Sequence, residues 1–177
     1  MTVNIVILAL VTAQRLGELW LSKRNTARLL AEGAREHAPG HYRLIVLLHT
    51  AWLLALWLLA VPRSVDGFWL AMFALIELAR IWVLYSLGRR WTTRIIVPAR
   101  EPLIRRGPYR WLSHPNYLVV IAEIAVLPLV FGLWGVALTF SLLNGALLSV
   151  RIREENRALR SAIVNASPTD PSRQNAA

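Results

Sequence analysis

The stretch LVVIAEIAVLPLVFGLWGVALTFSLLNGALLSV, residues 118–150, decides the fold, because it is apolar almost throughout and contains a single ionisable side chain, Glu123. One helix of this length would measure about 50 Å, whereas the hydrocarbon core of a bilayer is about 30 Å thick and is crossed by roughly 20 helical residues. The helix-breaking residues Pro128, Gly132 and Gly135 lie near its middle. The stretch therefore predicts a helical hairpin with two membrane-spanning arms.

Three further apolar runs of near-spanning length precede this hairpin: Val3–Leu21, Leu44–Val61 and Phe68–Leu87. They lack the polar stripe, recurring every three or four residues, that a surface helix of a soluble bundle shows. We therefore predict an all-α polytopic membrane protein with about five transmembrane helices, the last two forming the hairpin. One domain is expected over residues 1–165, followed by a disordered Pro- and Ser-rich tail at 166–177.

The net charge of +10 is unevenly distributed, since seventeen of the twenty Lys and Arg residues lie in segments 23–43, 89–117 and 151–177. If the spans alternate, these segments share one side of the membrane, and the positive-inside rule makes that side cytoplasmic. The C-terminus is then cytoplasmic. Basic clusters at a membrane surface suit anionic lipid headgroups, so we expect membrane lipids as partners and no nucleic acid.

No metal site is expected. The chain contains no cysteine, and the histidines at His37, His41 and His49 are spaced by four and eight residues with a Pro-Gly pair at 39–40. That pair interrupts the helical face that would align the first two ligands. His49 and Trp52, in the second span, are interpreted as packing residues, with a substrate tunnel as the alternative.

Two polar segments flank the hairpin: RRGPYRWLSHPNYL at 105–118 and RIREENRALR at 151–160. Because a hairpin returns the chain to the side from which it started, the two segments should meet. They would bring together aromatic rings and carboxylates, those of Tyr109, His114, Tyr117, Glu154 and Glu155. Rings can stack on a base and attract a cation, while carboxylates accept from ammonium and ribose hydroxyl groups. These are the groups of S-adenosylmethionine, so we predict a pocket for this cofactor at the cytosolic face.

GPYRWLSHPNYL, followed beyond the hairpin by RIREENRAL, resembles the isoprenylcysteine carboxyl methyltransferase family of membrane enzymes. That family carries a Gly-x-Tyr-x-x-x-Arg-His-Pro-x-Tyr segment before a transmembrane hairpin and an Arg-x-x-x-Glu-Glu-type segment after it. The matching positions here are Gly107, Tyr109, His114, Pro115, Tyr117, Arg151, Glu154 and Glu155, with Ser113 where the family usually has arginine. The resemblance implies that S-adenosylmethionine binds at these residues near the cytosolic face, while a lipophilic substrate enters from the bilayer.

The N-terminal half is more similar to the bacterial branch of that family, through RLGEL at 15–19, HYRLIVLLH at 41–49 and WTTRI at 91–95. This branch includes alkylpyrone and alkylresorcinol O-methyltransferases associated with type III polyketide synthases. The resemblance implies methyl transfer to the carboxylate, enol or phenol oxygen of a prenylcysteine or a long-chain alkylpyrone or alkylresorcinol. It also implies a bacterial inner-membrane location and a link to a polyketide synthase pathway.

Five Arg and Glu side chains lie within the predicted spans, where each costs at least about 2.5 kcal/mol near the bilayer centre: Arg15, Glu18, Glu77, Arg80 and Glu123. Arg15 with Glu18, and Glu77 with Arg80, have the i, i+3 spacing of helical ion pairs. The first four form either a structural network that pairs the first span with the third or a functional site, whose cavity Glu123 would also line. In the second case Arg15, Glu18 and Glu123 contact the substrate.

The catalytic candidates depend on the acceptor. A carboxylate acceptor needs only a cation to orient it, such as Arg151 or Arg80. A phenolic acceptor, with a pKa of about 10, needs a base, for which Glu77 or His114 is a candidate. The sequence leaves both cases open.

Two other functions fit parts of the pattern. An NADPH-dependent membrane reductase is the alternative enzyme, because some sterol reductases resemble this fold. A small channel or transporter is the alternative without catalysis, and five spans without an inverted repeat disfavour it.

Overall fold

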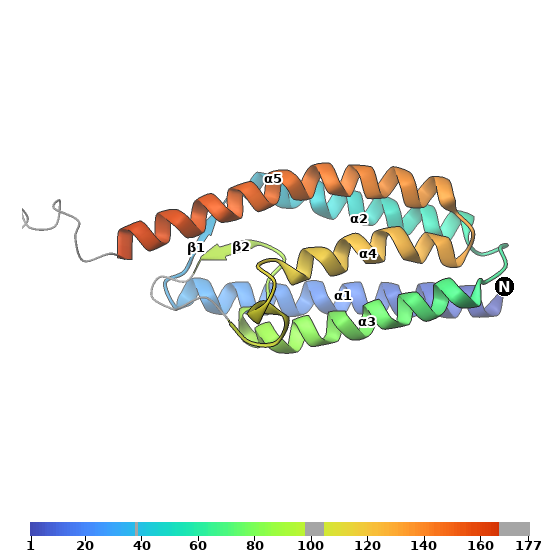
Figure 1. Ribbon diagram of the computed structural model, residues 1–177, viewed down its shortest axis with the longest axis horizontal. Coiled ribbons are helices and arrows are strands. Elements are labelled where there is room, and N and C mark those ends of the chain that lie inside the picture. Colours follow the sequence, from blue (N-terminus) through green and yellow to red (C-terminus); the bar gives the residue numbers. More distant parts are fainter. Residues whose placement is uncertain (38, 98–104, 167–177) are drawn as a thin grey trace, which may run out of the picture.

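The computed structural model describes residues 1–37, 39–97 and 105–166, which form an elongated bundle of helices (Figure 1). The helices are α1 (Thr2–Ala31), α2 (Pro39–Leu59), α3 (Gly67–Leu87), α4 (Pro115–Val130) and α5 (Trp134–Ala166). The connections contain two 3-10 turns, η1 (Gly88–Arg90) and η2 (Gly107–Arg110), and two short strands, β1 (Arg35–His37) and β2 (Ile95–Val97). The predicted all-α architecture is confirmed.

Four of the helices, α1, α2, α3 and α5, contain an apolar stretch long enough to cross a membrane, whereas α4 has only 16 residues. At 1.5 Å per residue α4 measures about 24 Å, less than the roughly 30 Å hydrocarbon core of a bilayer. Large apolar side chains such as Leu10, Leu58 and Leu78 are exposed on the outer faces of three different helices. The chain is an integral membrane protein whose outer surface suits lipid contact.

The predicted hairpin is confirmed, and its turn is short. α4 ends at Val130 and α5 begins at Trp134, with Gly132 at φ +66 between them. Glycine adopts this left-handed conformation at little cost. Pro128 lies inside the last turn of α4 rather than in the connection, and its carbonyl accepts from the N–H of Leu133 at 3.0 Å.

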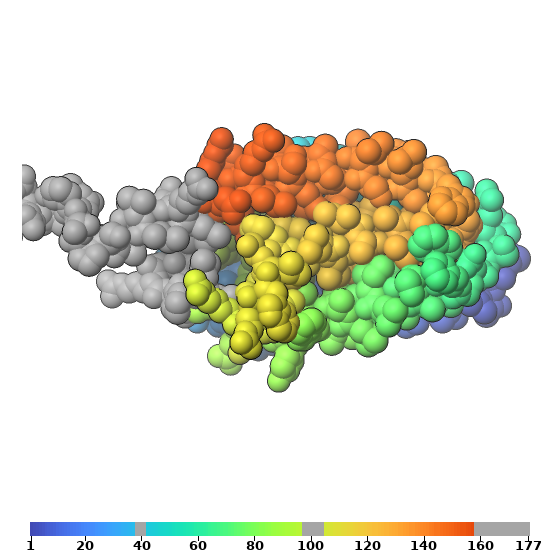
Figure 2. Space-filling view, viewed as in Figure 1, coloured from blue at the N-terminus to red at the C-terminus, as the bar shows by residue number. Residues whose placement is uncertain are grey.

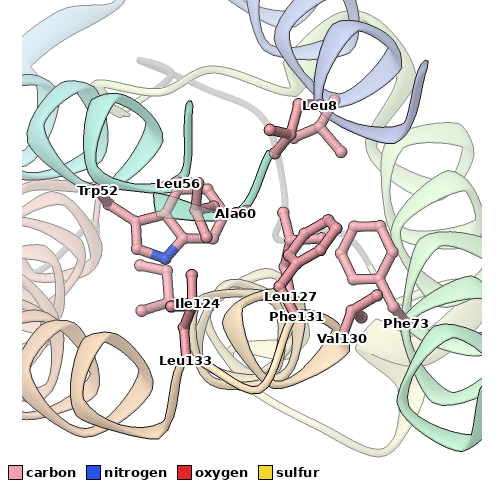
Figure 3. Packing of buried hydrophobic residues seen from close by; sticks show 11 residues of the cluster. Leu8, Trp52, Leu56, Ala60, Phe73, Ile124, Leu127, Val130, Phe131 and Leu133 are labelled. Atoms are coloured by element: carbon pink, nitrogen blue, oxygen red, sulfur yellow. The ribbon is translucent and has the colours of Figure 1, made fainter. Parts of the chain in front are cut away.

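Apolar side chains fill the half of the bundle that contains the hairpin turn (Figure 3). Leu8 from α1, Trp52 and Leu56 from α2, Phe73 from α3 and Leu127 from α4 are buried there. Since lipid is as apolar as these side chains, they stabilise the bundle mainly by close packing. α4 lies between α3 and α5 and packs against both (Figure 1, Figure 2).

In the described residues, the three basic segments lie at the end of the bundle opposite to the N-terminus and to the hairpin turn (Figure 1). α1 continues past Leu21, the predicted end of the first span, to Ala31, and Gly33 at φ +88 follows it. α5 also continues beyond the hairpin arm and includes Ala166, where the predicted tail begins. The rest of that tail, 167–177, lies outside the described residues.

A two-stranded antiparallel ribbon lies at this same end. In it β1 pairs with β2, so that His37 is opposite Ile95. β2 lies in the β-branched stretch 92–97, a composition that favours extended structure, whereas no local pattern indicates its partner strand. Arg94, next to β2, binds Glu36 at 3.0 Å, and its guanidinium lies 4.8 Å from the ring centroid of Tyr42. The ribbon therefore connects the α1–α2 loop to the segment that follows α3.

Candidate functional site

A cavity of about 420 Å³ lies between α1, α2, α4 and α5, and Arg80 of α3 also contributes to its wall. This volume is within the range of roughly 300–1,000 Å³ that small-molecule sites occupy. Much of its wall is apolar, including Leu16 and Leu19 from α1, Val46 and Leu53 from α2, and Leu148 from α5. Its polar wall residues include His49, Tyr117 and three arginines, Arg15, Arg80 and Arg151.

Next to the cavity, the two segments that flank the hairpin meet as predicted. Arg151 Nε donates to the Tyr117 hydroxyl at 2.9 Å, and that hydroxyl donates to Glu155. The rings of His114 and Tyr117 are stacked, with centroids 5.5 Å apart. We call Tyr109, His114, Tyr117, Glu154 and Glu155 the aromatic–acid cluster. Tyr117 belongs to this cluster and also to the cavity wall.

Local sequence explains how α4 presents this cluster. Pro115 occupies the first turn of α4, where its fixed φ suits the helix and its missing N–H costs nothing, and His114 precedes it at the N-cap. Tyr117 then follows in the same turn. From α5, Arg151 also donates through Nη2 to the Thr93 carbonyl at 2.6 Å. Arg151 therefore holds the start of α4 and the segment before β2 against one helix.

Tyr109 in η2 lies close enough to Glu155 to feel its charge. Burial raises the pKa of the Tyr109 phenol well above its usual value, and the Glu155 carboxylate raises this pKa further. The phenol therefore stays protonated at physiological pH and remains a hydrogen-bond donor. Glu154, by contrast, binds Arg157 three residues further along α5 at 2.7 Å, and its side chain is 28% exposed.

Gly107 also precedes α4, but it faces α3. Its φ is +56, and a Cβ on it would lie 2.0 Å from Ser86 Oγ. Arg106 beside it donates from Nε to the Ser86 carbonyl at 2.6 Å. Close approach to α3 is thus a sufficient reason for glycine at this position.

The ionisable residues of the spans form a buried network across α1, α3 and α4. Arg80 donates to both oxygens of Glu18, at 2.5 and 2.6 Å, and to Glu123 at 2.9 Å. Arg15 binds Glu123 at 2.8 Å and Glu18 at 2.9 Å. Glu77 accepts from Gln14 at 2.6 Å. The helical pair of Arg15 with Glu18 therefore exists, but most contacts of the network join different helices.

This network has one side on the cavity. Arg15, Glu18 and Arg80 line the wall, whereas Glu77 and Glu123 lie outside it. Glu123 is 2% exposed, and its Oε1 has no hydrogen-bond partner among the described residues. The structural network that the sequence left open is therefore present, and contact of its residues with a substrate stays a prediction.

Two cavity residues, His49 and Trp52, were interpreted from the sequence mainly as packing residues. Trp52 does belong to the apolar core, yet both line the cavity. The sequence does contain one signal that His49 and Trp52 line a common surface: their spacing with Tyr42 and Ile45 places all four on one face of α2. A lone histidine on an apolar helix gives no further indication.

Comparison with known proteins identifies the family of this chain. The model of the isoprenylcysteine carboxyl methyltransferase (ICMT) family matches residues 69–161, just over half of the chain. The chain is 36% identical over 159 residues to the uncharacterized protein YpbQ of Bacillus subtilis (strain 168), covering 87% of this chain and 95% of that protein. It is 26% identical over 159 residues to an uncharacterized protein of Haemophilus influenzae, covering 85% of this chain and 91% of that protein. No solved structure matches the chain with statistical significance. This chain belongs to the isoprenylcysteine carboxyl methyltransferase family of membrane methyltransferases.

Proposed function

We propose that this protein uses S-adenosylmethionine to methylate an oxygen of a lipophilic acceptor: a carboxylate, an enol or a phenol. Prenylcysteines and long-chain alkylpyrones or alkylresorcinols are the acceptor classes that its family resemblance suggests. The observation that carries the proposal is the direct contact between the aromatic–acid cluster and the cavity. The aromatic–acid cluster and the largely apolar cavity share Tyr117, and Arg151 of the cavity wall is hydrogen bonded to it.

The aromatic–acid cluster has the chemistry that the cofactor needs. Its rings suit stacking with adenine and attract a sulfonium, and its carboxylates suit the ammonium and ribose hydroxyl groups. Bound there, S-adenosylmethionine would supply an electrophilic methyl group. The residues of the chain would contribute alignment, which supplies up to about 7–11 kcal/mol in favourable cases.

Arg151 is suited to orient the acceptor. Its contacts within the described ranges use Nε and Nη2, which leaves Nη1 available at the cavity wall. A guanidinium N–H directed at an anionic oxygen forms a strong, charge-assisted hydrogen bond. Arg15 and Arg80 place two more positive charges on the same wall, although Glu18 and Glu123 pair with them.

The acceptor's hydrocarbon chain would lie along α1 and α2. The wall residues Leu16 and Leu54 are 62% and 57% exposed on the surface that meets lipid. A chain in the cavity can therefore continue into the bilayer without crossing a polar layer. If the acceptor is a pyrone or a resorcinol, a polyketide synthase is the class of enzyme that supplies it.

Binding of S-adenosylmethionine to the purified protein in detergent, measured by calorimetry, tests the proposal. Loss of charged hydrogen bonds should weaken binding by at least about tenfold in the Glu154→Gln, Glu155→Gln double variant. His114→Ala, which removes a stacking ring, should also weaken binding. Glu32→Gln is the matched control, since Glu32 lies at the exposed end of α1.

Unchanged binding in both cluster variants would reject this cofactor site, and binding of NADPH in place of S-adenosylmethionine would favour a reductase. Transfer of a radiolabelled methyl group to a panel of prenylcysteines, alkylpyrones and alkylresorcinols then identifies the acceptor. Failure with every acceptor, despite cofactor binding, would contradict the proposed acceptor classes.

A further inference from the structure

The imidazole of His49 has a defined tautomer. Its Nδ1 lies 2.8 Å from the carbonyl oxygen of Ile45, one turn earlier in α2. A carbonyl oxygen can only accept, so Nδ1 carries the proton and donates it. In the neutral ring, Nε2 then has a free lone pair. Among the described residues, Nε2 has no hydrogen-bond partner.

His49 faces charged or titratable groups from every helix around the cavity. These are Arg15 and Glu18 on α1, Tyr42 on α2, Arg80 on α3, Tyr117 on α4 and Arg151 on α5. Three of them are guanidinium groups, which donate hydrogen bonds and cannot accept a proton.

The other possible proton acceptors of the wall are already engaged. Both oxygens of Glu18 accept from Arg80. The Tyr117 hydroxyl donates to Glu155 and accepts from Arg151. Glu77 and His114, the bases that the sequence indicates, lie outside the cavity wall. Within the described part of the wall, His49 Nε2 is the acceptor best placed to take a proton.

We propose that His49 is the general base of this enzyme and removes the proton of a hydroxyl acceptor held in the cavity. The inference rests on the proposed methyltransferase function. As the acceptor O–H bond breaks, its proton passes to Nε2 and its electron pair forms the new O–CH₃ bond. The pair of the broken S–CH₃ bond stays on sulfur, which leaves a neutral thioether. The imidazolium then returns its proton to water before the next turnover.

The arginines of the wall complement this role. A phenol or enol that loses its proton develops negative charge on oxygen, and cations preorganised around the cavity stabilise that charge. A carboxylate acceptor, by contrast, is already ionised at neutral pH and needs no base. His49 therefore indicates a weakly acidic hydroxyl as the acceptor.

The variant His49→Asn tests the assignment. The Asn amide can still donate to the Ile45 carbonyl, but it cannot accept a proton at neutral pH. Methyl transfer to a long-chain alkylresorcinol should fall by about 10²–10⁴-fold in kcat at pH 7. KM for this acceptor should stay within about threefold, because the loss belongs to the transition state. S-adenosylmethionine binding, measured by calorimetry, should be unchanged, and His37→Asn, in β1, is the matched control.

The dependence on pH separates a base from a structural residue. Without the base, the rate follows the ionised fraction of the phenol, so the deficit of His49→Asn should shrink about tenfold per pH unit towards the acceptor pKa of about 10. Loss of structure would give a deficit that does not change with pH. A constant deficit, or a kcat equal to that of the unmodified protein, would overturn the proposal.

A second variant covers the case in which His49→Asn does not fold. His49→Ala leaves a space beside Ile45, and added imidazole should restore its activity in proportion to the neutral imidazole present. Lack of rescue in a variant that binds S-adenosylmethionine would overturn the assignment. Methylation of a prenylcysteine alone would reject the base and keep the methyltransferase, whereas absence of cofactor binding in the unmodified protein would reject both.

Discussion

Gly107 is explained by its immediate surroundings. Its φ of +56 belongs to the left-handed region, and the place of a Cβ is taken by Ser86 Oγ, 2.0 Å away, at the end of α3. A side chain here would displace η2, which carries Tyr109. The glycine therefore sets how closely the cluster approaches α3, whether or not it also contacts a ligand.

Gly107→Ala should lower the free energy of unfolding by about 1–3 kcal/mol, because it combines backbone strain with overpacking. In a chain of this size each kcal/mol corresponds to about 2–4 °C in Tm. Gly145→Ala is the control, since Gly145 lies in α5 with open space around it and should be neutral or slightly stabilising. Equal melting temperatures for the two variants, measured in the same detergent, would contradict this account.

The ionic network determines how three helices associate. Arg80 on α3 is 5% exposed and pairs with Glu18 on α1 and Glu123 on α4. Each charge alone would be costly in the membrane, so the helices gain by meeting where the charges neutralise one another. The same contacts fix the positions of Arg15 and Arg80 at the cavity wall, which links the packing of the spans to the geometry of the site.

Arg80→Met should lower the free energy of unfolding by about 3–5 kcal/mol, because it leaves two buried carboxylates without this partner. Arg80→Lys should be intermediate, since lysine keeps the charge but cannot reproduce the fork of donors. Arg63→Met, in the exposed turn after α2, is the matched control. Thermal unfolding followed by circular dichroism measures all three, and an Arg80→Met protein as stable as Arg63→Met would show that the network is dispensable.

The molecule as a whole has one basic end and one nearly uncharged end, and we propose that the basic end faces the cytoplasm. The absence of cysteine allows a direct test with single introduced cysteines. Ser64 lies in the turn between α2 and α3, Ser113 lies between η2 and α4, and both are exposed. Figure 1 shows that these two connections are at opposite ends of α3. In intact spheroplasts, a membrane-impermeant maleimide should label Ser64→Cys at once and Ser113→Cys only after permeabilisation. The reverse pattern would place the site on the outer face.

Long-range order was predictable where the chain itself supplied the signal. The hairpin follows from the length of 118–150 and its central glycine, and the meeting of Tyr117 with Arg151 and Glu155 follows from the hairpin. The i, i+3 spacing of Arg15 and Glu18 indicated one ion pair but not the links to α3 and α4, which depend on how helices rotate against one another.

Other features depend on tertiary contacts that no local pattern reports. β1 is a three-residue polar strand, and it exists because β2 lies beside it. His49 has ordinary surroundings in the sequence, and its importance comes from the cavity that other helices form around it. Pro128 was a reasonable candidate for the hairpin turn, but Gly132 makes the reversal because it tolerates a positive φ.

The shortness of α4 has a consequence for how two unlike reactants meet. Since α4 is about 6 Å shorter than the hydrocarbon layer, we propose that His114, at its N-cap, and the loop before it form a depression below the level of the headgroups. A water-soluble donor can descend into this depression, while an acceptor with a long chain stays anchored in lipid. In the proposed reaction neither reactant would have to leave its own phase, and the protein would avoid the cost of extracting a lipid into water.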